Sequence, residues 1–335
     1  MAKRAIFLRT VAVLLLICLC LPLFSCAKER GEDSRIKIVC TLFVQYDWLK
    51  NIVGESERVD LSLLIDNGTD LHSYQPTAAD IMEISDCDMI VYLGSDIDTW
   101  VAEAIERAEN SSLRRVALTE CEGITLKNIS SESEHGGHDH SEHDGHDHGA
   151  LDEHVWLSLK NAALICKALC EELCALDPDG AEEYRKNTAE YVASLAALDA
   201  EYASAVASVA EDKRFMLFCD RFPFIYLLED YGIDYAAAFE GCSTDVDADF
   251  ATVLRLIEEA DAHMLDCIIV TESSDRALAN TVASSSKRGV SRVLVMDSLQ
   301  AVGKGRIARG ESYLSVMKKN LSVLESALGI NDQEN

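Results

Sequence analysis

Short apolar runs alternate with segments of helical spacing along the first third of the chain. Helical spacing, with apolar side chains three and four positions apart, occurs at residues 46–53, 77–85 and 98–108, and Pro76 is well placed to start the second. Four apolar runs predict short buried strands: residues 36–42, 59–65, 89–93 and 115–118. Because strands that alternate with helices form βαβ units, this pattern predicts a parallel sheet.

A long helical region comes next. Residues 159–176 predict one helix, which ends at the Asp-Pro-Asp-Gly sequence of 177–180. Residues 181–209 contain no Gly or Pro and keep apolar positions three and four apart. At a rise of 1.5 Å per residue this second helix would be about 40 Å long, enough to cross a whole protein.

The alternation of strands and helices then resumes. Strands are predicted at residues 215–219, 233–239, 267–271 and 292–296, and helices at 223–230, 250–260, 276–285 and 313–328. The fold class is therefore predicted to be α/β, with two lobes of parallel sheet connected by the long helix. Ligands of such sheets bind beyond the carboxyl ends of the strands, so we expect the site in the cleft between the lobes.

These patterns divide the chain into segments. We place an N-terminal lobe at 36–128, a loop at 129–150, a helical region at 151–212 that includes the linker helix 181–209, and a C-terminal lobe at 213–330.

The N-terminus has the features of an export signal. A positively charged start precedes an apolar run at 11–21, which is too short to span a membrane. The run ends in Leu-Phe-Ser-Cys, which resembles a bacterial lipobox with Cys26 as the lipidated residue. We therefore expect a signal peptide at 1–25 and an extracytoplasmic lipoprotein that touches the membrane only through its lipid anchor. The alternative is an ordinary signal peptide with a chance cysteine.

Composition and charge narrow the function classes. Of the 335 residues, 48% are hydrophobic and 26% are charged, as in a folded globular protein. Without the three basic residues of the signal, 27 basic and 58 acidic residues leave a formal charge of −31. Nucleic acid and anionic lipid both require basic surface, so we exclude them as partners.

Cysteine spacing indicates no disulfide framework. Of twelve cysteines, two lie in the signal and one is Cys26, and the remaining nine are an odd number at irregular spacing. Cys166, Cys170 and Cys174 lie four apart and share one face of a predicted helix. We interpret them as small core residues rather than metal ligands.

A histidine-rich tract separates the first lobe from the helical region. Residues 134–149 read EHGGHDHSEHDGHDHG. Imidazole is the commonest protein ligand for borderline transition metals, and glycine keeps the segment too loose to pack a core. We expect a disordered auxiliary loop that collects metal through its six histidines: His135, His138, His140, His143, His146 and His148.

Four further segments place potential metal ligands at the ends of predicted strands or loops. His72 lies in DLHSYQP after the second strand, and His154 lies in DEHVW just after the histidine-rich tract. The sequence CDRFPF at 219–224 ends the first strand of the second lobe, and Asp297 ends its last strand. Two ligands from each lobe would suit a four-coordinate metal held across a cleft.

These motifs resemble those of the metal-binding proteins of zinc and manganese ABC importers, over about residues 38–328. DLHSY is similar to the family's Asp-Pro-His-x-Tyr, with Leu71 in place of Pro, and DEHVW matches its Asp-x-His-Val-Trp after a His/Asp-rich loop. Asp297-Ser298 and the Tyr-x-x-x-Met-x-x-Asn-Leu of 313–321 match two more motifs. The resemblance implies two α/β lobes joined by one rigid helix, an ABC permease as partner and no enzymatic activity. We also expect a monomer.

The third ligand is where this chain departs from the family. Zinc members usually present a histidine at the position of CDRFPF, and manganese members a carboxylate. An ungapped alignment places Arg221 there, which cannot ligate a cation, and a one-residue gap places Asp220 there. We therefore predict Asp220 as the third ligand, with Cys219 as the alternative.

The complete predicted ligand set is His72, His154, Asp220 and Asp297. Glu272, at the end of the third strand of the second lobe, is a candidate supporting residue, although a simple surface position is the better interpretation.

The ligand set leaves the metal and the role partly open. Two nitrogen and two oxygen donors accept Zn²⁺, which the histidine-rich tract favours, but they also suit Mn²⁺ or Fe²⁺. We expect a metal-capturing lipoprotein that delivers its ion to a permease, with a surface adhesin or zinc store as the alternative. A metallohydrolase is the weakest interpretation, because the chain has no HExxH or GxSxG motif and four protein ligands would close the coordination shell.

Overall fold

The computed structural model describes residues 35–108, 110–128, 151–239, 248–287 and 289–330. Contacts group all residues from Ile36 onward into one compact unit. The predicted signal peptide, Cys26 and the six histidines of the auxiliary loop lie outside the described residues. Within the described ranges, no helix combines the length and apolar character needed to cross a bilayer.

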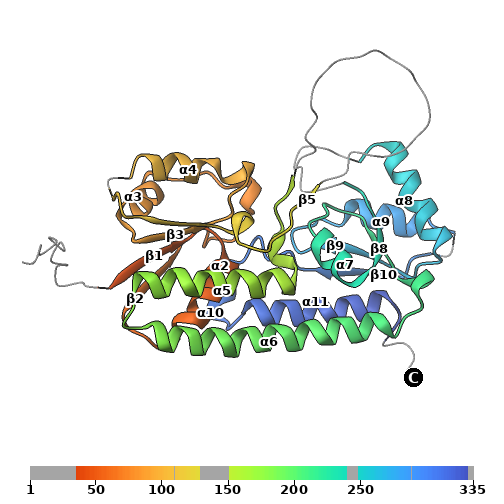
Figure 1. Cartoon of the computed structure of the whole chain (residues 1–335). Coiled ribbons are helices and arrows are strands. Elements are labelled where there is room, and N and C mark those ends of the chain that lie inside the picture. Colours follow the sequence, from red (N-terminus) through yellow and green to blue (C-terminus); the bar gives the residue numbers. More distant parts are fainter. Residues whose placement is uncertain (1–34, 109, 129–150, 240–247, 288, 331–335) are drawn as a thin grey trace, which may run out of the picture. The chain divides into compact units, whose positions relative to one another are not determined.

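The N-terminal lobe is a parallel four-stranded sheet of order β2-β1-β3-β4. Its strands are β1 (Ile36–Cys40), β2 (Val59–Leu63), β3 (Met89–Tyr92) and β4 (Arg114–Ala117). Its helices are α2 (Phe43–Val53), α3 (Ala78–Asp86) and α4 (Thr99–Glu106). The central strands β1 and β3 carry buried apolar side chains on both faces because helices cover both: α3 and α4 lie on one side and α2 on the other (Figure 1).

The C-terminal lobe repeats this plan with the strand order β10-β9-β7-β8, again all parallel. Its strands are β7 (Phe215–Phe218), β8 (Asp234–Ala237), β9 (Cys267–Thr271) and β10 (Arg292–Met296). Its helices are α7 (Ile225–Tyr231), α8 (Phe250–Ala262), α9 (Ala277–Ser285), α10 (Lys304–Ala308) and α11 (Tyr313–Ala327).

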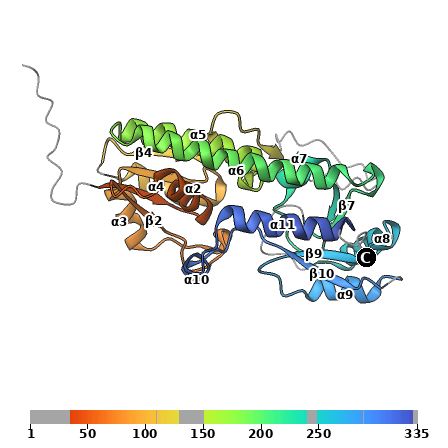
Figure 2. The ribbon, with the colours of Figure 1, turned by 90° about the horizontal axis from the view of Figure 1, so that it is seen from below.

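Two long helices connect the lobes. α5 (Leu159–Leu176) packs along α6 (Ala181–Ala207), and α6 passes under both lobes (Figures 1 and 2). Asn187 of α6 donates to the carbonyl of Ile52 in α2 at 3.0 Å, and the hydroxyl of Tyr202 donates to the carbonyl of Met317 in α11 at 2.6 Å. The prediction of two α/β lobes with parallel sheets and a helical linker is confirmed.

Short elements not foreseen from the sequence complete the chain. β5 (Lys127–Asn128) and β6 (Leu151–Asp152) form an antiparallel pair on either side of the histidine-rich tract. The 3-10 helices are η1 (Leu71–Ser73), η2 (Asp96–Asp98), η3 (Leu118–Glu120), η4 (Val155–Leu157) and η5 (Glu211–Lys213). η1 and the start of η4 carry the two histidines predicted as ligands.

Candidate metal centre

His72 is held by the aspartate two residues before it. Asp70 caps η1, and its Oδ1 accepts the backbone N–H of His72 at 2.9 Å and contacts the ring Nδ1 at 2.9 Å. A carboxylate that accepts a hydrogen bond from Nδ1–H fixes the tautomer in which Nε2 is the nitrogen that can bind a metal. That Nε2 lies 3.0 Å from Oε1 of Glu153. We call Asp70, Leu71 and His72 the His72 module.

His154 repeats this arrangement. Oδ1 of Asp152 accepts the backbone N–H of His154 at 2.9 Å and contacts its ring Nδ1 at 3.1 Å. His154 is fully buried, and its ring centroid lies 5.1 Å from that of Trp156. We call Asp152, Glu153 and His154 the His154 module.

The two modules meet at Glu153. Ligand atoms of His72, Glu153 and His154 all lie within 4.8 Å of one another, and no other group of this kind is formed by the residues that the structure describes. The imidazole rings stack with centroids 5.8 Å apart and planes at 27°. Nε2 of His154 lies 4.0 Å from Oε1 of Glu153. Two imidazole nitrogens and one carboxylate oxygen at these separations suit a borderline divalent cation.

The electrostatics of the modules favour charged carboxylates. Burial alone would raise the pKa of Glu153, but its hydrogen bond with His72 and the nearby imidazoles lower the pKa below its usual value. Burial likewise opposes the charged form of Asp70, while the bonds from His72 and the charge of Arg221 bring its pKa down to about 2. Both groups are therefore ionised at neutral pH and present negative charge to a cation.

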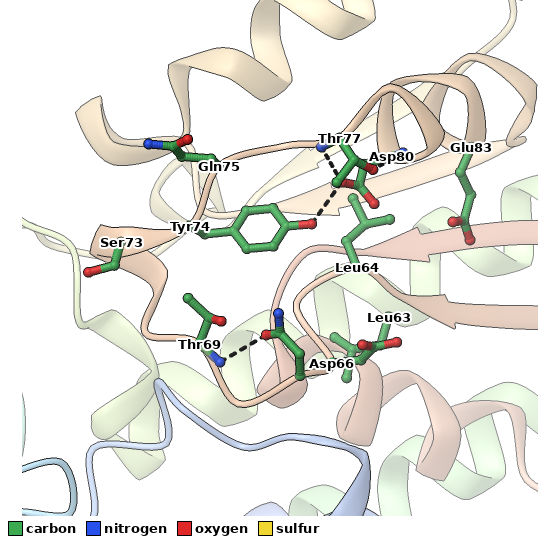
Figure 3. A pocket seen from close by; sticks show the side chains of 11 residues that line it. Leu63, Leu64, Asp66, Thr69, Ser73, Tyr74, Gln75, Thr77, Asp80 and Glu83 are labelled. Carbon is green, nitrogen blue, oxygen red and sulfur yellow. Dashed lines mark hydrogen bonds between the residues drawn. The ribbon is translucent and has the colours of Figure 1, made fainter.

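A pocket of about 500 Å³ lies beside the His72 module and is lined by residues between Leu63 and Glu83. Figure 3 shows Tyr74 crossing this pocket, with its hydroxyl donating to Oδ2 of Asp80 at 2.8 Å. Asp66 and Glu83 are two further carboxylates in its wall. The wall of this pocket is therefore rich in carboxylates, of which Asp66 pairs with Lys304.

Comparisons with known proteins agree with this geometry. The family model of ZnuA, the periplasmic component A of the zinc-uptake complex, matches residues 38–327. The chain belongs to this family. That membership confirms the resemblance drawn from the sequence motifs.

Relatives and solved structures extend the family match. The zinc-binding lipoprotein AdcA of Streptococcus pneumoniae is 34% identical over 322 residues, which cover 96% of this chain and 61% of AdcA. The chain thus spans less than two thirds of that relative. The high-affinity zinc uptake protein ZnuA of Bacillus subtilis is 32% identical over 298 residues, 89% of each chain. The crystal structure of the Zn(II)-bound ZnuA-like domain of S. pneumoniae AdcA matches with a TM-score of 0.68 and 27% identity, over 88% of this chain and 99% of that domain.

The residues predicted as ligands from the C-terminal lobe have other partners. Oδ2 of Asp220 accepts the backbone N–H of Thr271 at 3.0 Å and its hydroxyl at 2.6 Å. Oδ1 of Asp297 accepts the backbone N–H of Leu299 at 2.9 Å, and its Oδ2 pairs with Arg306. Neither side chain joins the group formed by the two histidines and Glu153 among the described residues.

Cys219 and Glu272, the alternative ligand and the supporting residue of the sequence analysis, also have other surroundings or partners. Cys219 is buried in an apolar cluster, and burial raises the pKa of its thiol to about 12. Glu272 accepts the backbone N–H of Ser298 at 2.8 Å and its hydroxyl at 2.7 Å. Burial, and then the charge of Asp297, raise the pKa of Glu272 above its usual value.

Sequence reasoning missed Asp70, Asp152, Glu153 and Arg221. The repeat of Asp-x-His in DLH and DEH was the signal for the first two, since an aspartate two positions before a histidine can bind both its backbone and its ring. Glu153 could not be recognised from the sequence because its contact with His72 joins residues 81 positions apart. The ungapped alignment did point to Arg221, but we set it aside because it cannot ligate a cation, and its pairing with Asp70 at 3.2 Å was not foreseen.

Proposed function

We propose that the chain is the substrate-binding component of an ABC importer, which captures a divalent metal ion, Zn²⁺ before others, and delivers it to a membrane permease. The observation that carries this proposal is the paired modules, which direct Nε2 of His72 and Nε2 of His154 toward the carboxylate of Glu153. Family membership supports this role over that of a metallohydrolase. Zinc in the named relatives and the imidazole pair both favour Zn²⁺, with Mn²⁺ as the alternative.

We assign His72, His154 and Glu153 as three ligands of the ion. The fourth position belongs to the C-terminal lobe, and Asp220 and Asp297 remain the predicted donors. Each would have to exchange an existing bond for the metal, Asp220 with Thr271 and Asp297 with Arg306. Cys219 is the weaker alternative, because its thiol must first lose a proton with a raised pKa.

The remaining parts of the proposal concern residues outside the described ranges. The histidine-rich tract serves as an auxiliary collector that holds metal more weakly than the preorganised centre. Lipidation of Cys26 anchors a monomer at the outer face of the cell membrane. β5 and β6, which flank the segment 129–150 in the sequence, pair with each other directly before the module that contains His154, and this supports a role for the tract near the centre.

Metal titration tests the proposal. The chain from residue 27 onward is titrated with Zn²⁺ and Mn²⁺, intact, without residues 135–148, and with His154→Ala. We expect one tight zinc site that survives deletion of the tract and is lost in His154→Ala. His263→Ala, which changes a histidine on the surface next to α8, is the matched control. If binding disappears with the tract and His154→Ala has no effect, the protein is a zinc store and the proposed centre is wrong.

A further inference from the structure

The carboxylate of Asp70 connects Arg221 of the C-terminal lobe with His72, a candidate metal ligand of the N-terminal lobe. Oδ1 of Asp70 holds the ring and backbone of His72, while its Oδ2 lies 3.2 Å from the guanidinium of Arg221. Arg221 follows β7 and so belongs to the C-terminal lobe. The orientation of the His72 ring therefore depends on a residue of the other lobe.

Arg221 is fixed within its own lobe. Its guanidinium donates to Oγ of Ser273 at 3.2 Å, and its backbone N–H donates to Oδ1 of Asp220 at 2.8 Å. Asp220 is bonded in turn to Thr271 at the end of β9. Because bonds at both its backbone and its tip hold Arg221, it moves with the C-terminal lobe. Separation of the lobes would pull it away from Asp70.

The Arg221–Asp70 ion pair is partly buried, and this makes its contribution larger than that of a surface pair. Only 22% of the Arg221 side chain and 17% of the Asp70 side chain are exposed. Ion pairs on open surface contribute little, but a partly buried pair whose carboxylate already serves another bond is harder to replace by water. Asp152 differs from Asp70 in this respect: among the described residues no Arg or Lys forms an ion pair with its carboxylate, and its link to the C-terminal lobe is a backbone one, from the hydroxyl of Tyr226 in α7 to its carbonyl at 2.7 Å.

We propose that Arg221 is a positioning residue that couples closure of the two lobes to the binding of the metal by His72. This inference rests on the proposed function. With the lobes closed, Arg221 holds Asp70, and Asp70 holds the His72 ring with Nε2 toward the ion. When a partner separates the lobes, the Arg221–Asp70 pair opens first, His72 gains rotational freedom, and the ion is left on the His154 module and leaves.

Electrostatics alone predicts the opposite result, which makes the proposal testable. Removing a positive charge next to the centre would leave Asp70 more negative and should tighten cation binding and slow release. Loss of positioning should instead speed release while leaving the rate of capture nearly unchanged. Arg221→Gln separates the two effects, and Arg221→Lys keeps the charge but loses the planar fork that engages Asp70 and Ser273 together.

The experiment measures the rate constants of zinc binding and release in the purified protein by stopped flow, with release followed by a chelator in excess. We expect Arg221→Gln to raise koff by about tenfold, as for residues that orient ligands, and to change kon little. Arg221→Lys should lie between the wild type and Arg221→Gln. Arg185→Gln, which breaks an exposed ion pair with Glu171, is the matched control and should change neither rate.

A double-mutant cycle and a spectrum complete the test. In an Asp70→Asn background, Arg221→Gln should have no further effect on koff, because the connection is already broken. The visible absorption of the Co²⁺-loaded protein should shift in Arg221→Gln as the His72 ring loosens. An unchanged or slower koff in Arg221→Gln, or additive effects in the cycle, overturns the inference. Retention of tight binding in His154→Ala overturns the proposed function instead, so the two failures are distinguishable.

Discussion

The two Asp-x-His modules have the same local chemistry and different surroundings. In both, an aspartate holds the backbone N–H of the histidine at 2.9 Å and its Nδ1 at 2.9 or 3.1 Å. In the His154 module Asp152 and His154 are buried, and the neighbouring Trp156 is held by its indole N–H, which donates to the carbonyl of Ser298 at 3.0 Å. The His72 module lies on a loop and is partly exposed, and its aspartate relies on the other lobe. In our proposal, the same motif therefore supplies one ligand that is held permanently, His154, and one whose position depends on the other lobe, His72.

Removing each histidine in turn gives the largest expected effect on this comparison. His154→Ala should weaken Zn²⁺ binding by more than about 100-fold, because it removes a preorganised ligand inside the protein. His72→Ala should weaken Zn²⁺ binding less than His154→Ala does. Part of the free energy of binding through His72 is needed to order the segment that carries it. Competition titration against a chelator of known affinity measures both. Equal losses would contradict the distinction between a permanent and a conditional ligand.

Changing the supporting aspartates should have a smaller effect. Asp152→Asn and Asp70→Asn keep an oxygen acceptor but lose the charge that orients and polarises each ring, and we expect losses of about tenfold in Zn²⁺ affinity. The two should differ in kinetics. Asp70→Asn should act mainly on koff, because it also breaks the connection to Arg221. Stopped-flow release from both variants measures this, and identical kinetic profiles would remove the proposed asymmetry.

The fold could be predicted because its signals are local. Strands such as β1 and β9 are short, apolar on both faces and separated by helices, which is the pattern of a parallel sheet covered on both sides. The unbroken run that became α6 was recognisable from its length, with the end two residues earlier than predicted, at Ala207. Helix ends fray, so a difference of this size at a terminus is expected.

For the candidate site, the sequence predicted only those proposed ligands that lie in recognisable motifs. His72 and His154 were marked by DLHSY and DEHVW, and the structure brings them together. Asp220 was chosen because a one-residue gap aligns it with the third ligand of the family, but its hydrogen bonds with Thr271 depend on the neighbouring position of β7 and β9 in the sheet. Position along the chain reveals which side chains reach an edge of a sheet. It does not reveal which of them are already bonded there.

The smallest predicted effect concerns the stability of the metal-free protein in acid. The folded state lowers the pKa of Asp70 to about 2, from an ordinary value near 3.9. Because the folded state favours the charged carboxylate, this group stabilises the fold fully above about pH 4, and the contribution disappears as the pH falls toward 2. Asp70→Asn should therefore lose less stability than the wild type between pH 4.5 and 2.5, by about 1 kcal/mol. Urea unfolding across this range measures it, with exposed Asp212→Asn as the control. If Asp70→Asn and Asp212→Asn have the same pH dependence, the bonds to His72 and Arg221 do not stabilise the His72 module in the absence of metal, and its order must then come from the ion itself.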